Sequence, residues 1–213
     1  MFKAEDKKIR LNNKEVASTL HTNDKGASKG TANLANNPKH YEIQRNNNFE
    51  FYIEGLSKTV AKIENNTYAY DNADDVIRIS VAKAFVPHFT QNAIEVKRGN
   101  NTMKFAGVPT FSNGQIELND YIGAGTKDIL MAWQKQSYDV ETEKVGLASD
   151  YKKVAYLLEY TPDYQLIRTW KLMGCWISAL SESDYAYDSS DKHTIQVTIE
   201  YDKAFLDNSD VEG

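Results

Sequence analysis

Hydrophobic and polar residues alternate most regularly in the last third of the chain, and such alternation is typical of β-strands with two unlike faces. It predicts three strands there, over residues 154–160, 165–176 and 194–201. The tripeptide Thr161-Pro162-Asp163 closes the first strand, and a polar loop over 181–192 closes the second. Both segments are rich in residues that favour turns. The chain is therefore expected to end in a β-rich block.

Shorter stretches of alternation predict further strands, over residues 49–54, 56–63, 75–85, 93–98, 102–107 and 115–118. Gly99-Asn100-Asn101 supplies the positive φ angles that a hairpin turn needs, so the fourth and fifth of these strands should form a hairpin, with 115–118 as a further partner. Apolar residues at helical spacing predict one helix over 126–138, with Thr126 as its N-cap. The predicted fold is mainly β: a small antiparallel β-sandwich or barrel with one flanking α-helix.

The apolar face of each predicted element defines the expected core. Its members are Phe49, Phe51, Ile53, Ile77, Ile79, Val81, Ile129, Trp133, Ile195, Val197 and Ile199. The opposite face of the last strand is polar and continues past its end: Gln196, Thr198, Glu200 and Asp202. Because successive side chains of a strand point to opposite faces, these polar residues are expected outside the core.

Composition divides the chain into three parts. Residues 1–46 are polar and rich in asparagine, with few apolar residues. Such a segment buries too little surface to offset its ordering entropy, so we expect an arm that is flexible or ordered on a neighbouring subunit. Residues 47–206 should form the folded β domain, and residues 207–213 an acidic tail.

Charge and cysteine content narrow the classes of function. The 213 residues carry a net charge of −5, which argues against tight nonspecific binding of nucleic acid, because that requires a surplus of Lys and Arg. The single cysteine, Cys175, excludes an internal disulfide, and its apolar neighbours predict a buried, inert thiol. No apolar run predicts a membrane span or a secretory signal. The 13 tyrosines favour self-association through wet interfaces.

No motif predicts catalysis, a metal site or a cofactor. The acidic loops 71–75 and 183–191 lack the ligand spacing of a calcium loop, and turn formation accounts for their aspartates. The four histidines are scattered, and Gly123–Thr126 lacks the lysine of a phosphate-binding loop. We therefore expect that the protein is not an enzyme. A carbohydrate-binding β-sandwich, using Tyr185, Tyr187 and the acidic loops, is an alternative from a different class.

Several stretches, taken in order, resemble a known family. They are Asn48–Ile53, Ile94–Asn119, Trp133-Gln134, Asp150–Lys153 and Lys171–Trp176, together with the final strand. In this order and spacing they are similar to the major tail tube proteins of contractile-tailed bacteriophages, the family of the T-even phage tube protein. The resemblance covers residues 48–204, and the long polar arm departs from the family pattern.

The resemblance implies a structural virion protein of the phage tail, assembled in the host cytoplasm. Copies would close a shared barrel into a hexameric ring, and stacked rings would form the hollow tube that conducts DNA into the host. The implied partners are other copies, the tape measure, baseplate and terminator proteins and, in sheathed tails, the sheath. DNA would pass transiently, and Gln196, Thr198, Glu200 and Asp202 would face the lumen. Alternatives with this fold are a tail terminator, a baseplate ring and the tube of an injection system.

Overall fold

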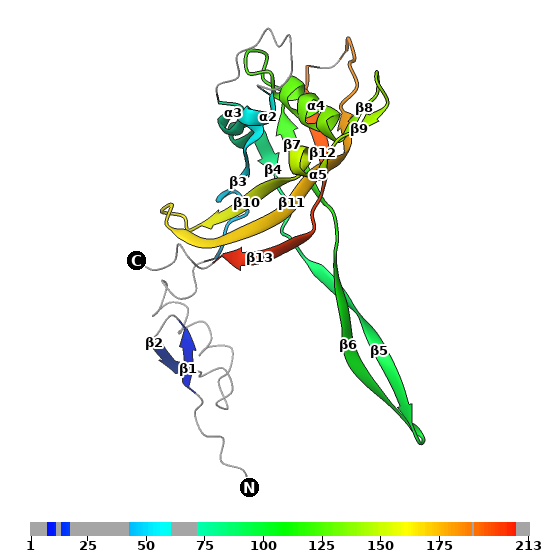
Figure 1. The fold of residues 1–213 in the computed structure, drawn as a ribbon. Helices are drawn as coiled ribbons and strands as arrows, with labels where there is room; N and C mark the ends of the chain where they lie inside the picture. Colours follow the sequence, from blue (N-terminus) through cyan, green and yellow to red (C-terminus); the bar gives the residue numbers. More distant parts are fainter. Residues whose placement is uncertain (1–7, 12–13, 18–42, 61–71, 189, 208–213) are drawn as a thin grey trace. The chain divides into compact units, whose positions relative to one another are not determined.

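The computed structural model describes residues 8–11, 14–17, 43–60, 72–188 and 190–207 (Figure 1). The chain divides into two compact units, residues 1–45 and 46–213. In the first unit, β1 (Lys8–Leu11) pairs antiparallel with β2 (Lys14–Ala17), although the sequence predicted no strand in the polar arm. The remainder of that arm up to residue 42 lies outside the described residues. So does the predicted acidic tail, except for Asp207, which ends β13 (Lys203–Asp207).

The second unit consists mainly of strands. Besides β13 they are β3 (Phe49–Glu54), β4 (Val81–Lys83), β5 (Phe89–Arg98), β6 (Asn101–Phe111), β7 (Gly114–Asn119), β8 (Tyr138–Asp139), β9 (Lys144–Val145), β10 (Lys153–Tyr160), β11 (Leu166–Glu182) and β12 (Thr194–Glu200). The helices are α2 (Leu56–Val60), α3 (Ala73–Ser80), α4 (Thr126–Ser137) and α5 (Ala148–Tyr151).

Seven strands form one antiparallel sheet in the order β3-β10-β11-β12-β7-β4, with β13 paired to β11 as well. The 17-residue strand β11 serves both parts of this sheet. Its first part pairs with β10 on one side and β13 on the other, and its end pairs with β12. The sheet curls into a nearly closed barrel, which confirms the predicted mainly-β fold class. The hexameric ring implied by the resemblance stays a prediction.

The strand β11 bends at Gly174. This residue has φ = 73°, a left-handed conformation that a side chain disfavours. Next to it the register with β10 shifts by one residue, which marks a β-bulge. On the opposite edge the chain passes from β12 to β13, and the backbone N–H of Asp202 donates to the carbonyl of Met173 at 2.9 Å. The bulge thus carries β11 from one part of the sheet into the other.

The interior of the barrel is packed with apolar side chains, and three helices cover it. The helix α4 packs against β11, and α3 packs against β3 and β7, while α2 contacts both helices. Trp133 of α4 is 1% exposed, and its Nε1 donates to the carbonyl of Tyr151 at 2.7 Å. The predicted core residues that are buried are Phe51, Ile53, Ile77, Ile129, Trp133, Ile195, Val197 and Ile199. Phe49 and Val81 are partly buried against this core.

The strand predicted over residues 75–85 is wrong, because the helix α3 precedes the short strand β4 there. Ile79 was expected in the core with Ile77, but its side chain is 71% exposed. Two residues apart on a helix lie on nearly opposite sides, so only one of the two isoleucines can face the barrel. The inward positions of α3 are Ala73, Ile77 and Ser80, which recur at helical spacing.

The strand predicted over residues 56–63 is also wrong, because residues 56–60 form the helix α2. Its first backbone N–H groups are satisfied by a distant side chain: Asp74 Oδ1 accepts from Leu56 N at 2.6 Å and from Ser57 N at 3.3 Å. A cap 17 or 18 residues away leaves no local signal in the sequence. Residues 61–63 and the loop after them lie outside the described residues.

Three further expectations need correction. The strand β7 pairs with β12 and β4, and is not a partner of the hairpin that precedes it. The N-cap of α4 is Gly125, while the hydroxyl of Thr126 is buried and hydrogen-bonded to the hydroxyl of Ser80 at 2.9 Å. Four helices are present in the described part of the second unit where one was predicted, and β8, β9, β13 and α5 were not predicted.

Replacement of Gly174 by alanine should destabilise the barrel. A Cβ at this position would clash with the carboxylate of Asp202, which pairs with Lys152 Nζ at 2.7 Å. The left-handed φ adds backbone strain, so we expect the free energy of unfolding to fall by about 1–2 kcal/mol. Urea titration followed by tryptophan fluorescence measures this change. Gly123→Ala is the matched control, because a Cβ there meets open space. Equal stability of the two variants would contradict the role of Gly174.

Candidate assembly surfaces

The hairpin of β5 and β6 extends away from the barrel (Figure 1). Its strands pair from Phe89 opposite Phe111 at the root to Arg98 opposite Asn101 at the tip. All residues of β5 are exposed, and the tip turns through Gly99 with φ = 61°. The predicted hairpin and its glycine turn are therefore confirmed, although both strands are longer than the sequence indicated.

One face of this hairpin is apolar over four exposed residues. Ile94 lies opposite Phe105 and Val96 opposite Met103, so alternation brings the four side chains to the same face. Their exposed fractions lie between 45% and 55%. A two-stranded hairpin is marginally stable alone in water, and a contiguous exposed apolar face marks an interaction site. We call these four residues the hairpin face.

The other face of the hairpin is charged. Lys104 Nζ lies 3.3 Å from Glu95 Oε1 across the two strands. Lys97 follows on the same face, and Arg98 begins the turn. Both of these cations are exposed. Since Glu95 offsets Lys104, the tip carries a positive surplus beside its apolar residues.

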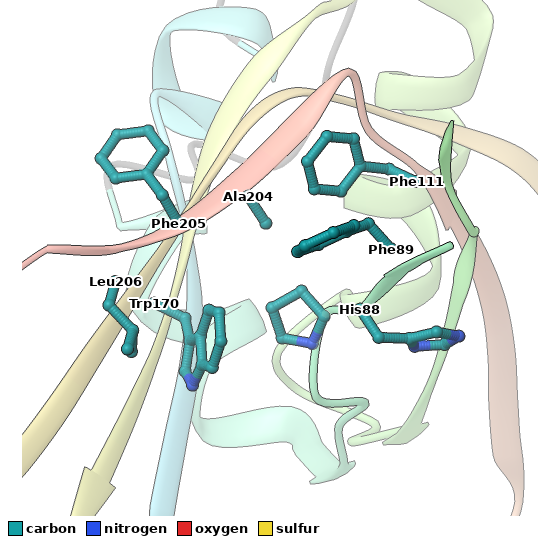
Figure 2. A pocket seen from close by; sticks show the side chains of 8 residues that line it. His88, Phe89, Phe111, Trp170, Ala204, Phe205 and Leu206 are labelled. Atoms are coloured by element: carbon teal, nitrogen blue, oxygen red, sulfur yellow. The ribbon is translucent and has the colours of Figure 1, made fainter. Parts of the chain in front are cut away.

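An apolar groove of about 460 Å³ lies between the root of the hairpin and β13 (Figure 2). The residues that line it are Pro87, His88, Phe89, Phe111, Trp170, Ala204, Phe205 and Leu206. Trp170 donates from Nε1 to Glu159 Oε1 at 3.0 Å, so its polar atom is satisfied and its ring is available for packing. Phe205 and Leu206 are 42% and 43% exposed on a strand that pairs only with β11 among the described strands.

Tyr201, the residue after β12, fixes the hairpin root to the barrel. Its hydroxyl donates to the carbonyl of His88 at 3.3 Å, and its ring lies 5.9 Å from the ring of Phe111. The ring of Phe85 stacks on the ring of Tyr201, with the ring centres 5.7 Å apart. Burial raises the pKa of the Tyr201 phenol, so the hydroxyl remains a hydrogen-bond donor at neutral pH. The hairpin therefore extends from a root held by side-chain packing.

The loop 120–125 begins beside the end of the loop 183–193, of which residue 189 lies outside the described residues. The backbone N–H of Asp120 donates to the carbonyl of His193 at 3.2 Å, and the ring of Tyr185 stacks on that of His193 at 4.7 Å. Ile122 and Tyr187 are fully exposed. Tyr185, a candidate residue of the alternative carbohydrate-binding site, stacks one ring face on His193 and is 81% exposed. We call the two loops together the end loops.

The predicted lumen residues lie on and next to β12. Gln196 is exposed, and Thr198 and Glu200 are half-buried on the strand face opposite the buried Val197. Glu200 accepts a hydrogen bond from Asn113 Nδ2 at 2.9 Å. Asp202 lies beyond the end of β12, where its carboxylate pairs with Lys152. The structure thus brings three of the four residues together on one strand face, and Asp202 belongs to the bend of β11.

Cys175 is fully buried, and this burial raises the pKa of its thiol to about 12. It is therefore protonated and unreactive at neutral pH. Among the described residues, no three of His, Cys, Asp and Glu gather in a way that could hold a metal ion. No helix in the described ranges is both long and apolar enough to cross a membrane.

Sequence reasoning did not single out the hairpin face or the groove. The signal for the hairpin face was present, because Ile94, Val96, Met103 and Phe105 alternate with charged and polar residues. The groove was missed because β13 was not predicted, which left Phe205 and Leu206 without a strand.

No family model matches the chain, and no curated protein matches it. The solved structures with a similar fold include the following three. A chain of the extended sheath–tube complex of the extracellular contractile injection system PVC has 13% identity and a TM-score of 0.56, over 81% of this chain and 96% of that chain. The PVC sheath/tube terminator has 16% identity and a TM-score of 0.55, over 78% and 97%. The cap that terminates the anti-feeding prophage tube has 12% identity and a TM-score of 0.54, over 78% and 91%.

At these identities the likeness shows the fold alone. The chain has a fold found in components of contractile injection systems. This agrees with the broader expectation of a tail-tube-like fold. The narrower assignment to T-even phages stays a prediction.

Aspartates at Ile94 and Phe105 should abolish self-association and leave the barrel folded. The two residues face each other on the hairpin face, and burying a carboxylate in an apolar contact is strongly unfavourable. Because both residues are exposed, we expect the free energy of unfolding to change by less than about 1 kcal/mol. Sedimentation velocity measures assembly, and circular dichroism measures folding.

The matched control for this pair is Glu95→Gln with Lys104→Gln, which removes the ion pair on the opposite face of the same strands. We expect this control to assemble like the wild type. Unchanged assembly of the Ile94→Asp/Phe105→Asp variant would show that the hairpin face is not a contact.

Proposed function

We propose that this protein is the tube subunit of a contractile, phage-tail-like machine, in which copies form rings and rings stack into a hollow tube. The observation that carries the proposal is the β5–β6 hairpin, whose apolar face lies far from the barrel and needs another molecule to cover it. The barrel fold supports the same assignment, because it aligns with nearly the whole of a chain from a sheath–tube complex.

The sheet itself has edges that neighbouring copies can cover. β3 and β4 end the strand order, and β13 pairs on one side only among the described strands. Uncovered edges are prone to uncontrolled pairing, so proteins cover them or close them. A contact between different surfaces of identical subunits gives a ring if the rotation closes, and a filament if it does not. Lateral closure and axial stacking together build a tube.

The proposed tube guides a cargo past its inner wall. The net charge of −5 per chain suits the passage of DNA, because a basic wall would retain a polyanion. In a phage tail the cargo is the genome, the location is the virion tail, and the partners include the tape measure, baseplate and terminator proteins. In an injection system the same tube would carry a different cargo. Detection of DNA in purified particles separates these two versions.

A tube terminator or cap is the second candidate. The PVC terminator and the anti-feeding prophage cap align with TM-scores of 0.55 and 0.54, against 0.56 for the sheath–tube chain. A terminator would stop after one ring, because its function is to end the polymer. The length of the assembly therefore separates the two candidates.

Purified protein should form hollow tubes many rings long in negative-stain electron microscopy. We expect tube length to increase with protein concentration, because a head-to-tail contact has no intrinsic end. Single rings at every concentration would favour the terminator, and a monomer at every concentration would contradict the proposed function. The Ile94→Asp/Phe105→Asp variant is the negative control on the same grids.

A cysteine at Gln196 should test the lumen assignment. Because the native Cys175 is buried with a thiol pKa raised to about 12, the introduced thiol is the reactive one at neutral pH. In assembled tubes we expect Gln196→Cys to react with a small maleimide but not with a maleimide on a large protein. Dissociated protein, the control, should react with both. Reaction of intact tubes with the large reagent would place Gln196 on the outer wall.

A further inference from the structure

We propose that His193 joins the two end loops in a pH-sensitive way, its charged imidazolium bridging Asp120 of one loop and Ser183 of the other. We call these three residues the loop clasp. The clasp lies within one copy, so the inference goes beyond the proposed function and does not depend on assembly. His193 directly precedes β12, and 17% of its side chain is exposed. The contacts of its two ring nitrogens carry the inference.

The Nε2 nitrogen of His193 lies 3.1 Å from the backbone carbonyl oxygen of Ser183. A carbonyl oxygen only accepts hydrogen bonds, so this contact assigns a hydrogen to Nε2. A neutral imidazole carries a single ring hydrogen on nitrogen, and Nδ1 is then an acceptor with a lone pair. Ser183 is fixed by its own backbone, because its N–H donates to the carbonyl of Thr194 at 3.0 Å. The position of the Ser183 carbonyl therefore sets the tautomer of the neutral ring.

The Nδ1 nitrogen of His193 faces a second acceptor. It is buried, it forms no hydrogen bond with the described residues, and it lies 3.4 Å from Oδ2 of Asp120. In the neutral ring the lone pair of Nδ1 and the carboxylate of Asp120 repel each other, and a buried polar atom without a hydrogen bond costs free energy. A second proton, on Nδ1, turns this repulsion into a charge-assisted hydrogen bond. The clasp is therefore complete only when His193 is charged.

The groups packed around His193 act on its charge in opposite directions. Glu182, at the end of β11, lies 3.8 Å from Nε2, but its carboxylate already pairs with Lys127 of α4 at 2.7 Å. Tyr185 stacks on one face of the imidazole, and an aromatic ring attracts a cation. Burial of the ring disfavours a charge, whereas the carboxylate of Asp120 favours it. Asp120 is therefore the group that balances the imidazolium.

The other charged groups near these loops are engaged elsewhere or exposed to solvent. Lys192 precedes His193 in the chain, and its Nζ lies 3.0 Å from Asn119 Oδ1 and 3.8 Å from Glu117 Oε1. The aspartates of residues 183–191 are exposed, so water and salt screen their attraction for the imidazolium. The pH response of the clasp therefore depends mainly on one histidine and one carboxylate.

Protonation of His193 should hold the end loops in their observed arrangement. Histidine changes its charge between about pH 5 and pH 8, so the response falls in the physiological range. Because the charged form completes the clasp, its stabilisation is present at acidic pH and is lost as the pH rises. The N–H of Asp120 donates to the carbonyl of His193 at 3.2 Å and thereby reports on the same contact. The fully exposed Ile122 and Tyr187 belong to the two loops that the clasp holds.

Hydrogen–deuterium exchange of the full-length protein at about pH 5.5 and about pH 8 tests the clasp. The measured quantity is the protection factor of the Asp120 amide, taken relative to the exchange rate of an unfolded chain at the same pH. We expect protection of the wild type to be about threefold higher at the acidic pH, the effect of one partly buried ion pair. His193→Gln should remove this difference. His88→Gln is the matched control, because His88 is exposed and lies outside the end loops, and it should keep the difference.

Asp120→Asn is the sharper variant. Its side-chain amide can donate to the lone pair of Nδ1 in the neutral imidazole, so the clasp should form at the alkaline pH and protection should no longer fall as the pH rises. Wild-type pH dependence in Asp120→Asn would overturn the proposal. Equal protection of the wild type at both pH values would overturn it too.

Nitrogen NMR of the His193 ring provides an independent measurement in the same full-length protein. At the alkaline pH we expect the hydrogen on Nε2, and at the acidic pH a hydrogen on each ring nitrogen. A neutral ring with its hydrogen on Nδ1 would contradict the clasp. These results stand whether or not the protein forms tubes, so failure of the clasp and failure of the proposed function are distinguishable.

Discussion

The hydrogen-bond ladder along β11 is the constraint on which the rest of this structure depends. One 17-residue strand pairs with β10, β12 and β13, and thereby joins both parts of the sheet. It can do so only because Gly174 adopts a left-handed conformation at a bulge, which turns the strand without breaking its pairing. The two parts of β11 on either side of this bend position β12, which carries core residues, and β13, which lies beside the hairpin root.

The sequence was most informative where strands alternate cleanly, and least informative where tertiary contacts decide the element. β10 and β12 were predicted within a residue of each end, because one of their faces is buried and the other is polar. Residues 75–80 were misread because Ile77, Ile79 and Val81 alternate like a strand, although Ile79 is exposed on the helix α3. The cap of α2 by Asp74 depends on a contact that no local pattern contains.

The candidate surfaces show the same division. The hairpin was predictable from its turn and its alternation, and the identity of its apolar face follows directly from the observed register. The groove and the pairing of the two end loops were not predictable, because they bring together segments as distant as Trp170 with Phe89, and Asp120 with His193. A surface made from several loops becomes visible only when the backbone is folded.

The short link between β6 and β7 has a mechanical consequence. Only Ser112 and Asn113 separate the two strands, and β7 pairs with β12 along its whole length. A tensile load applied to the tip would enter the barrel along β7 and act in shear on that ladder. Hydrogen bonds loaded in shear share the force, whereas bonds at a peeled edge break one after another. Tyr201, packed against Phe85 and Phe111, stiffens the joint at which the force enters.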